Sequence, residues 1–97
     1  MLTMRSQSIY KVPQGKLLKI SLEYNQDNNV IKNIRITGDF FAYPEEAIER
    51  MEREINGTLL EKKQLLEKIH SIINVDHIHF IGLDAESLVQ GILMCKQ

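Results

Sequence analysis

Cysteine is nearly absent from this sequence: Cys95 stands alone, two residues from the end. One cysteine excludes a disulfide within the chain, a Cys-x-x-Cys metal site and a paired redox thiol. Tryptophan is missing, and only two prolines and five glycines interrupt the chain. No long apolar run opens it, so we expect neither a signal peptide nor a membrane helix and predict a cytoplasmic protein.

Neither sign of charge dominates, because the 12 basic and 13 acidic side chains nearly cancel. The two halves differ, with six cations and three anions in residues 1–43 against six cations and ten anions in residues 44–97. The ordinary interpretation is an acidic helical surface beside a mildly basic sheet. The alternative is a surface for an anionic ligand or an acidic partner, formed by Lys11, Lys16, Lys19, Lys32 and Arg35. An excess of three cations without a basic aromatic stripe does not predict nucleic-acid binding.

The first half of the chain has the pattern of strands. Apolar and polar residues alternate from Lys16 to Tyr24, which predicts a half-buried strand. The polar turn of residues 25–29 leads to a returning strand, Val30 to Thr37. Ser8 to Val12 is expected to add a short edge strand. We expect residues 1–8 to fray, so the chain divides into a tail over 1–9 and one domain over 10–97.

The second half has the pattern of helices. Pro44 suits the first helical position of a helix that ends at Asn56-Gly57. A capping box, Thr58 to Glu61, is expected to start a second helix, and Asp84 to cap a third. Their apolar positions recur at helical spacing: Ala47, Ile48, Met51 and Ile55; Leu59, Leu66, Ile69 and Ile73; Leu88, Val89, Ile92 and Leu93. Strands followed by helices predict an α+β fold: a small antiparallel sheet of about three strands, then about three helices packed on one face.

The junction from Thr37 to Pro44 is the most distinctive segment. A strand ends at Gly38, where we expect a backbone conformation or a close approach that a Cβ would not allow. Asp39 could act as a general base, but a carboxylate at this place more often accepts backbone N–H bonds and pins the turn. Phe40 and Phe41 could stack on a ligand, although packing in the core beneath the first helix is the more usual role.

A second segment, Lys11-Val12-Pro13-Gln14-Gly15-Lys16, joins the edge strand to the hairpin. It has two interpretations: a solvated loop, or a loop that reaches across to a neighbouring molecule. Lysine supplies a compact cation that suits phosphate. The GxxxxGK[ST] pattern of a nucleotide-binding P-loop is missing.

The segment His77-Ile78-His79 could place two imidazoles on one side of a strand as metal ligands. Zinc needs three or four ligands and no third is evident. We therefore expect two exposed polar side chains and no metal site. No GxSxG or HExxH motif occurs, and we assign no catalytic residue to the chain.

Together the loop and the junction resemble the C-terminal accessory domain of lipoate–protein ligases, including the form made as a separate small subunit. The resemblance covers roughly residues 10–93. Its pattern matches at Lys11, Val12, Pro13, Gly15, Lys16, Thr37, Gly38, Asp39, Phe40, Phe41, Pro44 and Glu45. Gln14 departs from it, because a second glycine is common there in relatives.

The resemblance implies an accessory, non-catalytic subunit with a fold like that of iron–sulfur scaffold proteins. In lipoate ligases the large domain holds lipoate, ATP and Mg²⁺, forms lipoyl-adenylate and passes the lipoyl group to a lysine of an acceptor domain. The small domain covers that site. This chain would then bind no cofactor alone and act as a heterodimer with the catalytic subunit, with Lys11, Pro13, Gly15 and Lys16 facing the partner's active site. An iron–sulfur-assembly-like scaffold or sulfur acceptor, or a generic interaction module, is the alternative.

Overall fold

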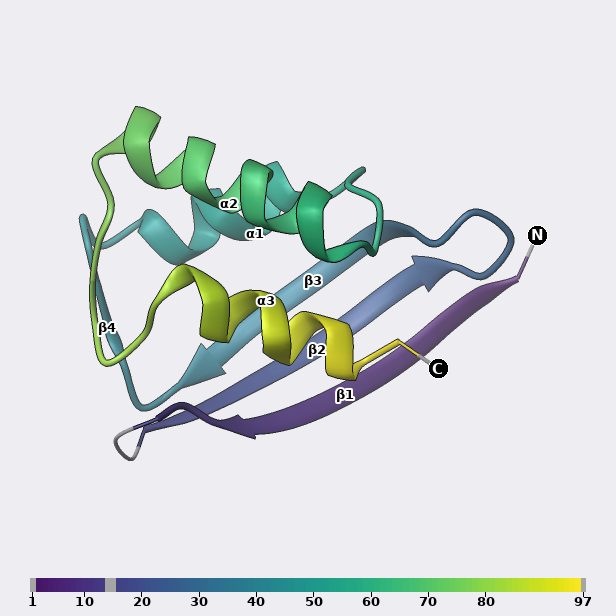
Figure 1. The fold of residues 1–97 in the computed structure, drawn as a ribbon, viewed down its shortest axis with the longest axis horizontal. Helices are drawn as coiled ribbons and strands as arrows, with labels where there is room; N and C mark the ends of the chain where they lie inside the picture. Colours follow the sequence, from purple (N-terminus) through teal and green to yellow (C-terminus); the bar gives the residue numbers. More distant parts are fainter. Residues whose placement is uncertain (1, 14–15, 97) are drawn as a thin grey trace.

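Three long strands form an antiparallel sheet in the order β1-β2-β3 (Figure 1). The computed structural model describes residues 2–13 and 16–96. The three strands are β1 (Thr3–Lys11), β2 (Leu17–Asn25) and β3 (Val30–Gly38). The expectation of a frayed tail over residues 1–8 is wrong, because β1 pairs with β2 along its whole length, from Thr3 opposite Asn25 to Lys11 opposite Leu17. Most side chains of β1 are polar, so apolar and polar residues do not alternate along it. Strands pair through backbone hydrogen bonds, which do not require such an alternation.

The hairpin of β2 and β3 follows the predicted alternation. The four inward side chains of β2 are buried, as are Ile34 and Ile36 of β3. Between Glu23 and Tyr24 the register shifts, so that Tyr24 faces Ile31 and Glu23 faces Asn33. A shift of this kind inserts one extra residue into the ladder. It lets Ile31 and Ile34, three positions apart, point to the same side.

All three helices cover one face of this sheet (Figure 1), and the core lies between the two layers. They are α1 (Ala47–Ile55), α2 (Lys62–Asp76) and α3 (Ala85–Met94). The predicted α+β arrangement is therefore confirmed. The side chains that fill the space between the layers are the following: Leu18, Ile20, Leu22, Tyr24, Ile31, Met51, Ile55, Leu65, Ile69, Leu88 and Ile92.

Two helix starts differ from the sequence prediction. Pro44 is not the first helical residue, because α1 begins at Ala47, whose N–H donates to the Pro44 carbonyl at 2.9 Å. Thr58 caps no helix: the Thr58 carbonyl accepts a bond from the Ile31 N–H at 2.9 Å, and α2 starts only at Lys62. Pairing with β3 thus replaces the expected capping box. Asp84 does cap α3, accepting from the Ser87 N–H at 2.7 Å.

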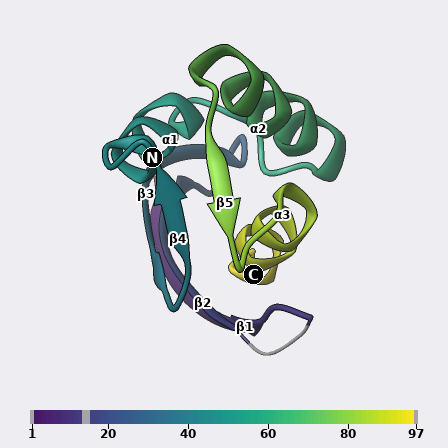
Figure 2. The same ribbon diagram turned by 90° about the vertical axis from the view of Figure 1, so that its left-hand side faces the viewer.

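A second, two-stranded sheet closes one end of the molecule (Figure 2). β4 (Phe41–Tyr43) pairs with β5 (His79–Ile81), which joins α2 to α3. The sequence analysis did not predict this ribbon. Three-residue strands are too short to show a period, and the long stretch of chain between Tyr43 and His79 hides their pairing.

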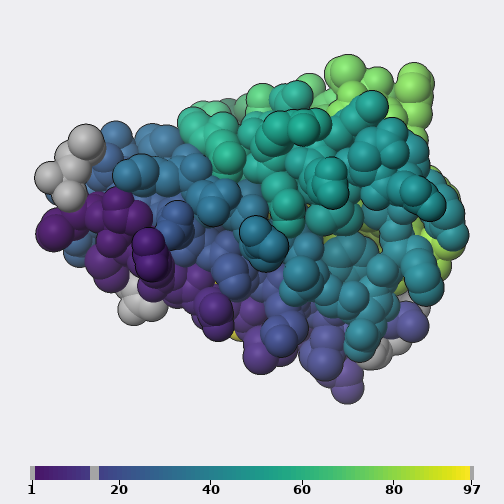
Figure 3. Space-filling model, turned by 180° about the vertical axis from the view of Figure 1, so that it is seen from behind, coloured from purple at the N-terminus to yellow at the C-terminus, as the bar shows by residue number. Residues whose placement is uncertain are grey.

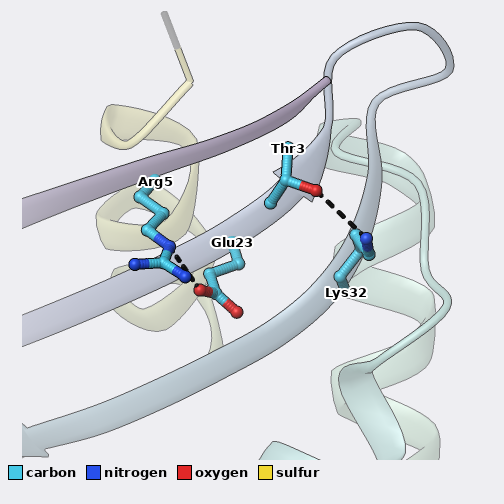
Figure 4. A network of polar contacts seen from close by, with 4 residues as sticks. All are labelled: Thr3, Arg5, Glu23 and Lys32. Carbon is cyan, nitrogen blue, oxygen red and sulfur yellow. Dashed lines mark hydrogen bonds and ion pairs between the residues drawn. The ribbon is translucent and has the colours of Figure 1, made fainter. Parts of the chain in front are cut away.

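The β3 edge of the large sheet is covered, and one face of the sheet is open. Along β3, residues 57–60 bond to the start of the strand, and the Glu52 carboxylate accepts the Ile36 N–H at 2.7 Å. The face turned away from the helices is uncovered, and its purple and blue strands are visible in Figure 3. Polar contacts cross this face in Figure 4, where Arg5 pairs with Glu23 at 2.7 Å and Lys32 donates to Thr3 at 3.0 Å. Among the described residues, no helix has the length and apolar character needed to cross a membrane.

The Glu52 bond gives a first prediction. Glu52→Ala leaves the Ile36 N–H without its carboxylate acceptor, and we expect the free energy of unfolding to fall by about 1.5–3 kcal/mol. Glu52→Gln keeps a side-chain acceptor and should lose less. Chemical denaturation measures both, with Glu49→Ala on the exposed side of the same helix as control, expected within about 0.5 kcal/mol of the wild type. Equal stability of Glu52→Ala and Glu49→Ala would contradict this role for the bond.

Candidate functional site

Gly38 sits where the sheet ends and the chain turns toward the β4–β5 ribbon. Its φ is +154°, and a Cβ at this position would overlap the carbonyl oxygen of Leu17 on the neighbouring strand. The same carbonyl accepts the Asp39 N–H at 3.0 Å. Strand β3 therefore leaves the sheet through a tight main-chain contact that only glycine fits, which agrees with the sequence-based expectation for Gly38.

The side chains after Gly38 do not all behave as expected. In the described part of the chain the Asp39 carboxylate accepts no hydrogen bond, so the backbone of Asp39 pins this turn and its side chain does not. Phe40 packs against the core as predicted. The same prediction for Phe41 is wrong, because Phe41 points outward on β4 and is 65% exposed. Thr37 is exposed opposite Lys19, and Pro44 is exposed after β4.

The loop between β1 and β2 is anchored at both ends. The Val12 N–H donates to the Lys16 carbonyl at 2.8 Å, and the Val12 side chain is buried in the core. Pro13 is exposed beside it. Gln14 and Gly15 lie outside the described residues, so the expectation placed on Gly15 remains a prediction.

Lys16 and Lys11 take different positions. The Lys16 side chain runs along Gly82, where a Cβ would come within 3.1 Å of its Cγ. Lys11 pairs with Leu17 at the end of β1, on the uncovered side of the sheet. The two lysines thus flank this end of the molecule from two sides and do not converge on one point.

An open groove of about 410 Å³ lies between this loop and the segment that follows β5. Its walls are formed by Val12, Pro13, Lys16, Gly82, Leu83 and Asp84. The Asp84 carboxylate accepts the cap bond from Ser87, and Lys16 is the cation among the residues that line the groove. The open groove can place the Lys16 cation against an anionic group held by a neighbouring molecule. It is too open to be an enclosed active site.

The loop, the junction and the segment after β5 therefore share one end of the domain, which faces the viewer in Figure 2. Sequence reasoning missed Gly82, Tyr43 and Ile81 at this end. The only signal was the short run Phe80-Ile81-Gly82, an apolar pair before a glycine, and it did not distinguish a strand from a helix end.

Among the described residues, the histidines and the cysteine take no part in a metal site. His77 follows α2 as its C-cap residue, with a φ of +53°, and His79 lies in β5. Within residues 2–13 and 16–96, no three His, Cys, Asp or Glu side chains gather as metal ligands. Cys95 is fully buried, its Sγ 3.4 Å from the Ser8 hydroxyl, and burial raises the pKa of the Cys95 thiol. Cys95 is therefore a protonated core residue.

The junction gives a second prediction. Gly38→Ala should lower the free energy of unfolding by about 1–3 kcal/mol through the strained backbone, and by roughly 1 kcal/mol more through the displaced bond to Leu17. Gly57→Ala is the matched control, because Gly57 has a φ of +89° but no atom lies within 4 Å of the place that an added Cβ would take. It should cost only about 1–2 kcal/mol. Thermal and urea denaturation compare the two, and equal losses would show that the Leu17 contact contributes nothing.

The comparisons with known proteins agree on one family. A family model described as "Bacterial lipoate protein ligase C-terminus" matches residues 11–92. A Thermoplasma acidophilum protein named "Lipoate-protein ligase A subunit 2" is 42% identical over 53 residues, which are 55% of this chain and 53% of that protein. The match therefore spans only about half of the relative's length.

A solved structure is also similar over nearly the whole fold. It belongs to a study of a bi-partite lipoate protein ligase and its E2 lipoyl domain from Thermoplasma acidophilum. The TM-score is 0.79 with 26% sequence identity, covering 94% of this chain and 97% of the other. The family model spans the loop, the junction, strands β2 and β3 and the β4–β5 ribbon described above. This chain belongs to the family of lipoate protein ligase C-terminal domains.

Proposed function

We propose that this chain is the accessory, non-catalytic subunit of a two-part lipoate–protein ligase. It would act as a heterodimer with a catalytic subunit that binds lipoate, ATP and Mg²⁺, forms lipoyl-adenylate and lipoylates an acceptor domain. The observation that carries the proposal is the match of residues 11–92 to the ligase C-terminal family. Its similarity to a relative named as a subunit adds support. We place the reaction in the cytoplasm, where a free thiol such as that of Cys95 persists.

The geometry favours an auxiliary role over catalysis by this chain. The groove beside Lys16 is open, and its lining combines this lysine with an aspartate that caps α3. Adenylation transfers the adenylyl group of ATP to the carboxylate of lipoate and releases pyrophosphate. A cation aligned with the reacting phosphate stabilises the negative charge that develops there. Closure of a second protein over the site also excludes water from a hydrolysable acyl-adenylate. A small domain can provide both without a pocket of its own.

The iron–sulfur alternative is less well supported. It requires an accessible thiolate to hold a cluster or to accept sulfur. Cys95 is buried at the C-terminal end of α3, and its raised pKa keeps the thiol protonated. The one thiol of this chain is therefore unsuited to that chemistry.

A third prediction concerns the isolated chain. With ATP, Mg²⁺ and lipoate it should release no pyrophosphate, and pyrophosphate should appear when the catalytic subunit from the same organism is added. The measurement is a coupled pyrophosphate assay on each protein and on the mixture. Turnover by the isolated chain, or a catalytic subunit that gains nothing from it, would refute the accessory function.

The fourth prediction concerns the lysines of the loop. Lys16→Ala should slow lipoyl-adenylate formation by the reconstituted pair, at a cost on the order of 2–4 kcal/mol if the ammonium contacts the transition state. Lys11→Ala should have a weaker effect, since Lys11 lies on the uncovered side of the sheet. Binding of the catalytic subunit and the melting temperature should barely change.

The matched control for these variants is Lys63→Ala, which removes an exposed cation from α2. Lys63→Ala should keep the wild-type rate. If the double variant Lys11→Ala/Lys16→Ala also keeps the wild-type rate, the loop has no role at the phosphate.

A further inference from the structure

The β4–β5 ribbon carries large apolar side chains on both of its faces. Ala42 and Phe80 point inward and pack against the core. Phe41, Tyr43 and Ile81 point outward and are 65%, 52% and 48% exposed. A strand that carries apolar residues on both faces is typical of one that is covered from both sides. In this chain alone, only the inner face of the ribbon is covered.

Four side chains of the ribbon point outward, and His79 is one of them. The other three form the surface that we call the end patch: Phe41, Tyr43 and Ile81. Phe41 lies directly opposite Ile81 in the register, and Tyr43 lies opposite His79. Residues opposite one another in an antiparallel pair share a face, with Cβ atoms about 5 Å apart. Clustered large apolar side chains, in contrast to single scattered ones, mark contact surfaces.

The uncovered side of the large sheet is mostly polar, although Ile9 and Leu17 are exposed on it. Arg5, Gln7, Ser21 and Glu23 line a shallow hollow there, and ion pairs and hydrogen bonds join its strands (Figure 4). Such a face is stable in water. The end patch is the surface that gains more from being covered, because its exposed atoms are mainly apolar.

The family match indicates which molecule covers it. The matched family is the C-terminus of bacterial ligases, and the match starts at Lys11. The similar protein is named as one subunit of a ligase, and the similar structure belongs to a bi-partite ligase, so the other ligase subunit is the molecule expected to cover the patch. Lys11 ends β1 at the same end of the molecule as the ribbon (Figure 1), and the loop that follows it reaches Gly82, next to β5. The end patch therefore lies at the end of the domain that also bears Lys16, the cation that the proposed function assigns to the partner's phosphate.

We infer that the end patch is the surface through which this chain docks onto the catalytic subunit of the ligase. The inference rests on the proposed function and adds a location to it. Docking there covers the second face of the ribbon. It also sets Lys16, which runs along Gly82 one residue beyond Ile81, at the margin of the interface. A cation at that margin is placed to reach across to a phosphate held by the partner.

The test measures binding of this chain to the catalytic subunit from the same organism by titration calorimetry. Phe41→Thr and Ile81→Thr each remove an apolar contact and keep a residue that favours strands. We expect the dissociation constant to rise about tenfold for each and about a hundredfold for the double variant. Melting temperatures should stay close to the wild type, because the replaced side chains are exposed. Should the double variant melt early, the single Ile81→Thr variant carries the comparison.

Ile9→Thr is the matched control. It makes the same replacement at a residue that is 61% exposed on the uncovered sheet face, and it should bind like the wild type. An equal loss in Ile9→Thr would place the interface on the sheet and overturn the inference. Wild-type binding by the double variant would also overturn it. The same holds if the double variant loses only the self-association of this chain and still binds the catalytic subunit. If the wild-type chain itself fails to bind the catalytic subunit, the proposed function fails first.

Discussion

The contact between Gly38 and the Leu17 carbonyl is the constraint on which the functional end of the molecule depends. The Leu17 carbonyl accepts the Asp39 N–H, and this bond requires the β3 backbone to come closer than any side chain at residue 38 would permit. From that point the chain leaves the large sheet, forms β4 and enters α1. The position of β4, and with it that of its partner β5, follows from this one approach of two main chains.

The ribbon then links elements that are far apart in the sequence. β5 is the connection between α2 and α3, and its pairing with β4 ties the helical layer to the end of the sheet. The Ser8 hydroxyl, which donates to the Gly91 carbonyl at 2.7 Å, fixes α3 to β1 farther along the sheet. Because both attachments hold α3, the segment after β5 keeps its place beside the β1–β2 loop. The groove at Lys16 is a product of that arrangement.

Polar and apolar surfaces are separated over this small domain. Along the β3 edge, Glu52 and residues 57–60 satisfy backbone groups that would otherwise be open to another strand. The uncovered sheet face carries mostly charged and polar side chains, with Ile9 and Leu17 exposed among them. The apolar ribbon lies beside the loop that bears Lys16. A subunit that must bind a partner and also present a cation to it benefits from having both features at one end.

The sequence by itself determined the hairpin, the inward positions of β2 and β3, the cap at Asp84 and the need for glycine at residue 38, because periodicity and turn chemistry are local. It also predicted the family, through the loop and the junction. Only the tertiary structure decided that Thr3 to Lys11 form a full strand, that Thr58 pairs with β3 and caps no helix, and that Phe41 faces outward. Each of these depends on a partner distant in the chain: β2 for the first, Ile31 for the second and β5 for the third. Hydrogen bonds between backbones leave little trace in the pattern of side chains. The sequence alone therefore could not indicate these three features, which depend on contacts formed in the folded protein.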